Sequence, residues 1–108
     1  MKILLITLLV ISNLFYLSGI YLLSMTRADA VTLLTKLAIA RKPELADTPV
    51  DSVFTDIGHL SAEQQHYIEL ARVIHITAGT TSTTFSPDEV APFWQWAILY
   101  GKMVMVSH

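Results

Sequence analysis

Histidine and glutamate side chains are the groups in this chain that could do acid–base or metal chemistry, but their spacing argues against both. The internal histidines are His59, His66 and His75, and no two of them lie four positions apart as in a metal-binding helix. Glu63 and Glu69 are six positions apart, so they do not share a helix face as a catalytic pair would. No Gly-x-Ser-x-Gly elbow frames a serine. We therefore expect a protein that is not an enzyme and that carries no metal or cofactor.

The length and composition of the chain restrict the classes of protein to which it can belong. The chain has 108 residues, which is enough for one small domain or two very small ones. A formal charge of −2, with 15% charged residues, gives no basic surface for nucleic acid. There is no cysteine, so neither disulfides nor thiolate metal sites can stabilise a core this small.

The N-terminal segment is an apolar run, Ile3 to Met25, without a charged residue. About 20 apolar residues can span a bilayer, and Lys2 resembles the basic start of a secretory signal. Three interpretations stay open: an uncleaved membrane anchor, a signal cleaved near Ala28-Asp29-Ala30, and a buried core helix. Because the run lacks proline, and Gly19 costs only about 1 kcal/mol, we predict one continuous helix from Ile3 to Leu23.

Apolar residues at helical spacing predict an all-α fold for the rest of the chain, built from helix–loop–helix units with little or no strand. The expected helices cover residues 26–42, 61–75 and 92–104. A linker over 43–52 and a threonine- and serine-rich loop over 77–86 separate them.

Capping residues mark two of the helix starts. Thr26 can cap the first helix, with Asp29 reaching back to it from three positions on. Ser61 and Gln64 form a capping box at the start of the next. Pro43 ends the first helix, since proline cannot continue it.

The last helix is expected to bury a strongly aromatic face. Residues three or four apart form that face: Phe93, Trp96, Ala97, Tyr100 and Val104. At helical spacing, one of Trp94 and Trp96 must point away from the core. These aromatic rings could stack on sugars, or they could supply one core anchor and one surface tryptophan.

A series of motifs runs through residues 53–106. They are Phe54-Thr55-Asp56-Ile57, the helix over 61–75, Ile76-Thr77-Ala78-Gly79-Thr80, Thr84-Phe85-Ser86-Pro87-Asp88 and Trp94-Gln95-Trp96-Ala97. In order and spacing they resemble one module of the S-layer homology family. Met25-Thr26-Arg27-Ala28-Asp29 is similar to the Thr-Arg-Ala-Glu motif that opens the family's second helix. Residues 9–42 therefore resemble a truncated module.

This resemblance implies a non-catalytic protein that attaches to the bacterial cell wall through an anionic polysaccharide. The family's binding arginine lies in the Thr-Arg motif, so Thr26 and Arg27 are expected ligand-binding residues, together with Asp56 and Gly79. A guanidinium beside a helix N-terminus offers a fork of donors to a carboxylate, and the helix dipole adds attraction. Arg27 could equally be a solvated first-turn residue or a membrane-flanking charge.

The second module departs from the family pattern. Pro92-Phe93 stand where Thr-Arg is expected, and His75 replaces a glycine. Phe93 cannot bind an anion, so we expect an altered or inactive pocket there. Arg27→Ala should abolish retention on wall material, whereas Phe93→Ala should act mainly by destabilising the fold.

We thus expect an apolar segment (1–24), a second helix of a truncated module (25–42), a linker (43–52) and a module (53–108). The expected function is attachment of an exported protein to the cell envelope. The alternative is a small membrane-anchored helical module that binds another protein, with the membrane contact through residues 3–23. Because the aromatic surface is large for so small a core, residues 51–108 are expected to self-associate, to join further modules or to pack on the first half.

Overall fold

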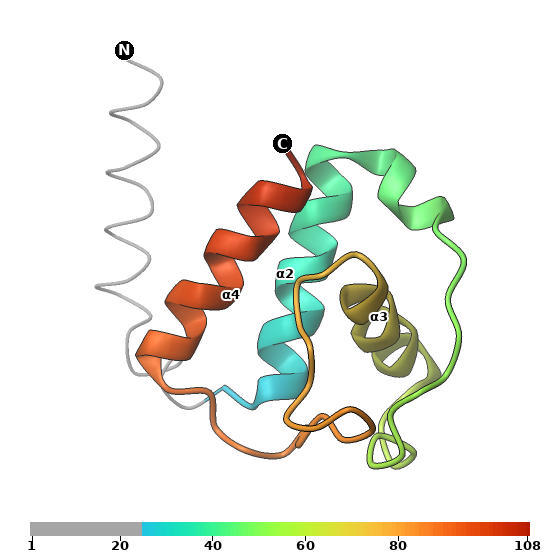
Figure 1. Cartoon of the computed structure of the whole chain (residues 1–108), viewed down its shortest axis with the longest axis vertical. Coiled ribbons are helices and arrows are strands. Elements are labelled where there is room, and N and C mark those ends of the chain that lie inside the picture. The colour runs from blue at the N-terminus through green and yellow to red at the C-terminus, as the bar shows by residue number, and fades with distance from the viewer. Residues whose placement is uncertain (1–24) are drawn as a thin grey trace.

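The structure is a computed structural model that describes residues 25–108, and this part of the chain is all-α (Figure 1). It contains α2 (Arg27–Arg41), the 3-10 helix η1 (Pro43–Asp47), α3 (Ala62–Val73) and α4 (Phe93–Val106). Within these residues the only strand-like pairing is an isolated antiparallel bridge between Thr26 and Val90. No helix among them is long and apolar enough to cross a membrane. The helix predicted over Ile3 to Leu23 lies outside the described residues.

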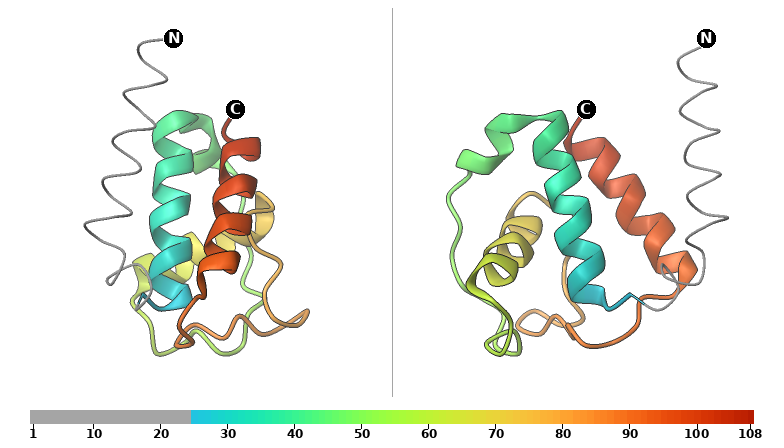
Figure 2. Two further views of the ribbon diagram at one scale, coloured as in Figure 1. Left: turned by 90° about the vertical axis from the view of Figure 1, so that its left-hand side faces the viewer. Right: turned by 180° about the vertical axis from the view of Figure 1, so that it is seen from behind.

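The central element is α2, which packs against both α3 and α4 (Figures 1 and 2). Because α2 belongs to the first half of the chain and α3 and α4 belong to the second, these contacts pack the two halves against each other. The core draws on all three helices and the intervening loop. Its most deeply buried apolar residues are Ala30, Val31, Leu34, Ala38, Ile68, Leu70, Ala71, Ile76, Phe85 and Ala91. Full burial of a leucine- or isoleucine-sized side chain contributes about 1.5–3 kcal/mol, so this set provides the main stabilisation.

The two predicted helix caps form, but their reciprocal halves do not. The backbone N–H of Asp29 donates to Oγ1 of Thr26 (3.2 Å), and that of Gln64 donates to Oγ of Ser61 (3.1 Å). Instead of reaching back to their own caps, Gln64 and Asp29 meet each other, with Nε2 donating to Oδ1 at 2.9 Å. The two side chains that were expected to complete the capping boxes therefore link the first turns of α2 and α3.

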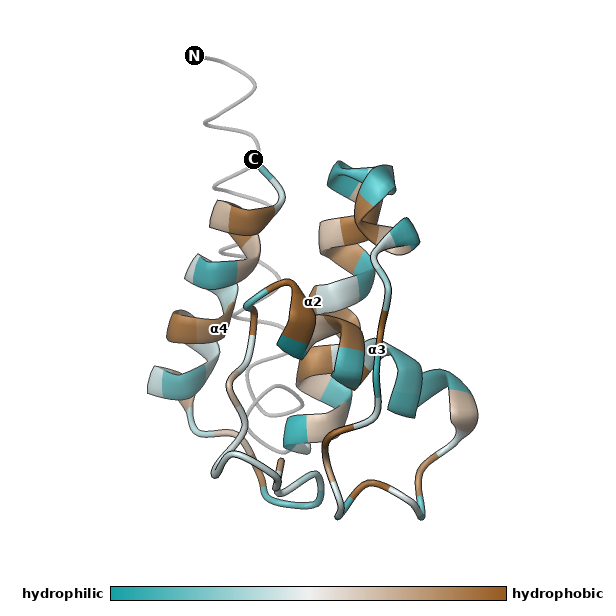
Figure 3. Cartoon of the chain, turned by 45° about the vertical axis from the view of Figure 1, so that its right-hand side comes forward, coloured by the Kyte–Doolittle hydropathy of each residue, from teal (hydrophilic) through white to brown (hydrophobic). Residues whose placement is uncertain are grey.

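The predicted buried face of α4 is correct for Trp96 but wrong for Phe93, Ala97 and Tyr100, which are exposed. Trp96, Leu99 and Met103 are buried, whereas Phe93 is 58% exposed and Tyr100 is 43% exposed. Apolar residues recur along the whole of α4 (Figure 3), so composition alone does not indicate which face turns inward. The expectation that one tryptophan points outward is confirmed, since Trp94 is 63% exposed.

The expected linker over 43–52 is partly helical. Pro43 occupies the first turn of η1, where its missing N–H costs nothing. The following segment runs beside α3, and the chain reverses direction before Ser61 caps that helix. This return path brings residues 52–57 next to the loop between α3 and α4. The candidate site lies where these two segments meet.

Candidate anion-binding site

Phe85 is the side chain around which the predicted ligand-binding residues gather. Its ring is fully buried, and the Arg27 guanidinium carbon lies 5.3 Å from the ring centroid. The Phe54 ring lies 5.4 Å from it on another side. Phe54 in turn stands directly over Gly79. The structure therefore places Arg27 and Gly79 against the same small aromatic cluster, although they come from α2 and from the loop after α3.

Arg27 is a nearly buried cation that forms no salt bridge among the described residues. The residue is only 8% exposed, and its buried Nε has no hydrogen-bond partner within residues 25–108. None of the ion pairs formed in this part of the chain includes Arg27. Burial lowers the pKa of the guanidinium, and attraction to Glu89 opposes that shift. Because arginine stays charged in proteins, the site holds a positive charge that no salt bridge within residues 25–108 neutralises.

The backbone donors at the start of α2 are already used. The N–H of Arg27 donates to the carbonyl of Glu89 (2.7 Å), and the N–H of Ala28 donates to the carbonyl of Pro87 (3.0 Å). Thr26 accepts the next two, from Asp29 through its hydroxyl and from Ala30 through its carbonyl. An anion therefore has no free backbone N–H at this helix start and would rely on the Arg27 side chain, while the Thr26 hydroxyl accepts as the helix cap.

Asp56 holds the loop that contains Phe85. Its two carboxylate oxygens accept the backbone N–H groups of Phe85 (2.9 Å) and Ser86 (2.8 Å). Burial raises the pKa of Asp56, but these backbone hydrogen bonds outweigh it, so the pKa of this carboxyl lies below its ordinary value. Asp56 thus positions Phe85 beneath Arg27, with each of its carboxylate oxygens accepting one backbone N–H group.

Gly79 has a geometric requirement that no other residue type meets. Its φ is +81°, which favours glycine. A Cβ at this position would lie 2.6 Å from the Phe54 ring and 2.6 Å from the backbone oxygen of Thr84. Gly79 therefore lets the loop close over the aromatic cluster, which is a shaping role.

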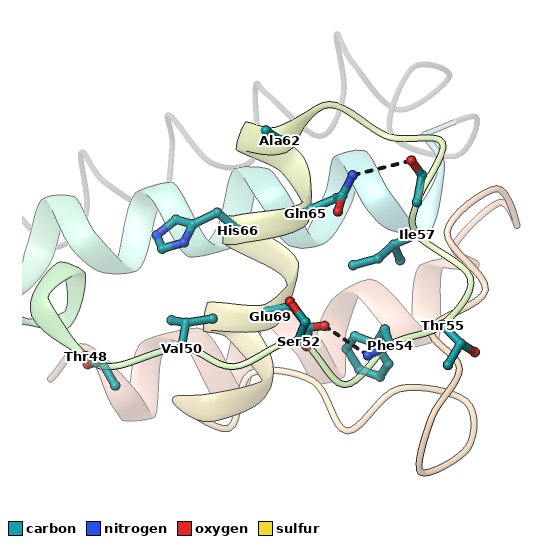
Figure 4. Close-up of a pocket in the computed structure, with 11 residues that line it drawn as sticks. Thr48, Val50, Ser52, Phe54, Thr55, Ile57, Ala62, Gln65, His66 and Glu69 are labelled. Atoms are coloured by element: carbon teal, nitrogen blue, oxygen red, sulfur yellow. Dashed lines mark hydrogen bonds between the residues drawn. The ribbon is translucent and has the colours of Figure 1, made fainter.

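A second feature, a cleft of about 470 Å³, lies between residues 48–58 and α3 (Figure 4). At its floor, Oε2 of Glu69 accepts the N–H groups of Val53 (2.7 Å) and Phe54 (2.9 Å). Its Oε1 accepts from Nε of Arg72 (3.0 Å), and Arg72 also pairs with Asp51 at 2.6 Å. Both carboxylate oxygens of Glu69 therefore accept hydrogen bonds from the protein itself, so Glu69 has a structural role in the cleft.

The histidines are dispersed. His59 pairs with Asp88 at 2.9 Å on the surface, and His66 lines the cleft beside α3. His75 follows α3 with a φ of 69°, in the left-handed conformation that favours glycine. Within residues 25–108 no three histidine or acidic side chains gather as a metal site.

Sequence reasoning missed Glu69 and Phe85 as organising residues. The only signal for Glu69 is its position between Ile68 and Leu70, which are both buried. Comparison of the chain with protein-family models, curated proteins and solved structures gives no match. The resemblance of residues 53–106 to an S-layer homology module therefore stays a prediction.

Proposed function

We propose that this chain is a non-catalytic cell-envelope attachment module that binds an anionic cell-wall polysaccharide through Arg27. The observation that carries the proposal is Arg27: the residue is 8% exposed, its buried Nε has no hydrogen-bond partner, and it forms no salt bridge among the described residues. Removing a cation from water without compensation is costly, and proteins retain such groups where a ligand compensates them.

The surroundings of Arg27 suit an anion. Phe85 supports the guanidinium from one side, and a ring beneath an arginine holds its plane while leaving its N–H groups for an acceptor. A carboxylate or phosphate is the acceptor that fits a guanidinium fork best. Glu89 is the nearby acid that acts on Arg27 electrostatically, and it would compete weakly with a bound anion.

The test uses the full chain with purified wall polysaccharide, native or with its carboxylates amidated. Arg27→Met keeps apolar volume over Phe85 and removes the charge. It should abolish retention on native polysaccharide while leaving the thermal unfolding midpoint equal or higher, since an unpaired buried charge has been removed. Arg41→Met, in the last turn of the same helix and exposed, is the matched control and should bind normally.

Two further results sharpen the test. Glu89→Gln removes the competing charge and should strengthen retention, and added salt should weaken it. Equal retention of the Arg27→Met variant and the unaltered chain would contradict the proposal. A large drop in the unfolding midpoint of Arg27→Met would instead show that Arg27 is structural.

The second candidate is a membrane-anchored module that binds another protein. The exposed apolar residues of α4, including Trp94 and Ile98, favour it, because large exposed apolar patches mark interfaces. Trp94→Ser should leave polysaccharide retention unchanged if Arg27 is the binding group. Loss of retention in that variant would show that Trp94 takes part in polysaccharide binding, whereas no retention by the unaltered chain would favour the second candidate.

A further inference from the structure

The outward face of α4 is an apolar stripe. Trp94, Ile98, Gly101 and Met105 recur every three or four residues, opposite the buried Trp96, Leu99 and Met103. Trp94 is 63% exposed, Ile98 50% and Met105 78%. Gln95 and Lys102 give α4 one polar side, whereas an apolar helix face such as this stripe is expected to be covered. The described residues cover only one side of α4, so the stripe lacks a partner among them.

Gly101 lies within this stripe. A Cβ built at Gly101 meets nothing within 4 Å among the described residues. Glycine in a helix interior costs about 1 kcal/mol relative to alanine. Nothing in residues 25–108 requires it, whereas a second helix that approaches α4 closely would.

The chain itself leads to this stripe. The carbonyl of Met25 accepts the N–H of Ala91 (3.2 Å), and Thr26 pairs with Val90. Met25, the last residue of the apolar run, is thus held beside Ala91, two positions before α4 begins. This tether gives the run a high effective concentration at the N-terminal end of the stripe.

Length and chemistry fit as well. The 21 residues from Ile3 to Leu23 carry no charge. As a helix they would reach about 30 Å, whereas the 14 residues of α4 span about 21 Å. Because Met25 is held beside Ala91, a helix that ends there and runs back along α4 would be antiparallel to α4. A run that starts beside Phe93 and extends along α4 in this way covers the whole stripe.

We propose that the outward face of α4 is the docking surface of the chain's own segment 3–23. The inference does not depend on polysaccharide binding, because the stripe and Arg27 share no residue. A lipid bilayer and a second copy of the chain are the competing occupants, and the experiment separates them.

The test is disulfide scanning in the full chain, which has no native cysteine. Ile98→Cys is combined in turn with one cysteine at each position from 12 to 21, and oxidation is followed by mass and by gel mobility, in lipid-free buffer and in phosphatidylcholine vesicles. Glu44→Cys, exposed in η1 on the other side of α2 from α4, is the control partner (Figure 1). We expect disulfides within one chain at positions recurring every three or four residues, at least about tenfold faster than with the control.

The other outcomes overturn the proposal. Disulfides between two Ile98→Cys chains would show that a second copy covers the stripe. Quenching of tryptophan fluorescence by brominated lipid, without disulfides to the segment, would show that a bilayer covers it. A second variant gives an independent readout: Gly101→Leu should lower the unfolding midpoint if a helix packs there. If it raises the midpoint through better helix propensity, the face is open to water.

Discussion

Glu69→Gln tests how α3 fixes the segment that precedes it. Glutamine keeps the volume, and its oxygen can still accept from the N–H groups of Val53 and Phe54. The amide nitrogen of the glutamine then faces the Nε–H of Arg72, and both groups are donors. The hydrogen bond that Arg72 Nε donates to the Glu69 carboxylate at 3.0 Å is therefore lost. A hydrogen bond to a charged group contributes about 1.5–3 kcal/mol. Arg72 is 22% exposed at its side chain and keeps Asp51, so we expect the lower part of that range, about 1.5–2 kcal/mol.

The assay is urea unfolding of the full chain followed by circular dichroism. Glu63→Gln is the matched control on the same helix, because Glu63 is 65% exposed and pairs with Lys36 at 3.1 Å. An exposed ion pair contributes about 0–1 kcal/mol, so this variant should unfold almost as the unaltered chain does. Glu69→Ala should cost more than Glu69→Gln, since it leaves the partly buried N–H of Val53 and the buried N–H of Phe54 without an acceptor. The reasoning fails if Glu69→Gln and Glu63→Gln lower the free energy of unfolding equally.

Three further changes test the loop geometry by thermal unfolding. Gly79→Ala should cost at least about 2 kcal/mol, because it combines positive-φ strain with a clash against Phe54, and an unchanged midpoint would contradict that. His75→Gly should stabilise by about 0.5–1 kcal/mol, since it relieves a left-handed conformation at the end of α3; destabilisation would show that the His75 side chain matters more. The pKa of Asp56 lies below its ordinary 3.8, so the stability it provides is present above that pH and is lost as the pH falls through its folded pKa. Asp56→Asn should therefore have a midpoint that is lower at neutral pH and less sensitive to acid, which a pH series would check.

Local signals in the sequence predicted the helices well. Thr26 and Ser61 start their helices as expected, because capping depends on a hydroxyl and the next three residues. The ends are less accurate: α3 stops at Val73 rather than at His75, and α4 continues to Val106. The left-handed turn through His75 provides the reason for the first difference, since it ends the helix with a residue that gives no glycine signal.

Nonlocal contacts could not be predicted in the same way. The orientation of α4 depends on which of its apolar sides meets α2, and Phe93 and Trp96 are equally apolar in the sequence. The candidate site shows the same limit. The family resemblance indicated Arg27 and Asp56 but not that Phe85 would join them, because that contact depends on how the loop closes on α2.

A final prediction follows from the central position of α2. Both α3 and α4 pack on it, and they make few contacts with each other. Residues 51–108 alone therefore lose the surface formed by Ala30, Val31, Leu34 and Ala38, all of which are buried. Loss of several fully buried side chains, each contributing about 1.5–3 kcal/mol, exceeds the about 3–5 kcal/mol that so small a core provides.

The expected result is that residues 51–108 unfold without a cooperative transition, or associate to cover the exposed face, whereas residues 25–108 unfold cooperatively. Circular dichroism melts together with sedimentation equilibrium measure both properties. The matched comparison is a two-chain mixture, in which a peptide covering residues 25–42 should restore the transition, because it returns the Thr26–Val90 pairing and the Arg27–Phe85 contact along with the core. If residues 51–108 are a monomer with a sharp transition of their own, α2 is not the element that holds α3 and α4 together.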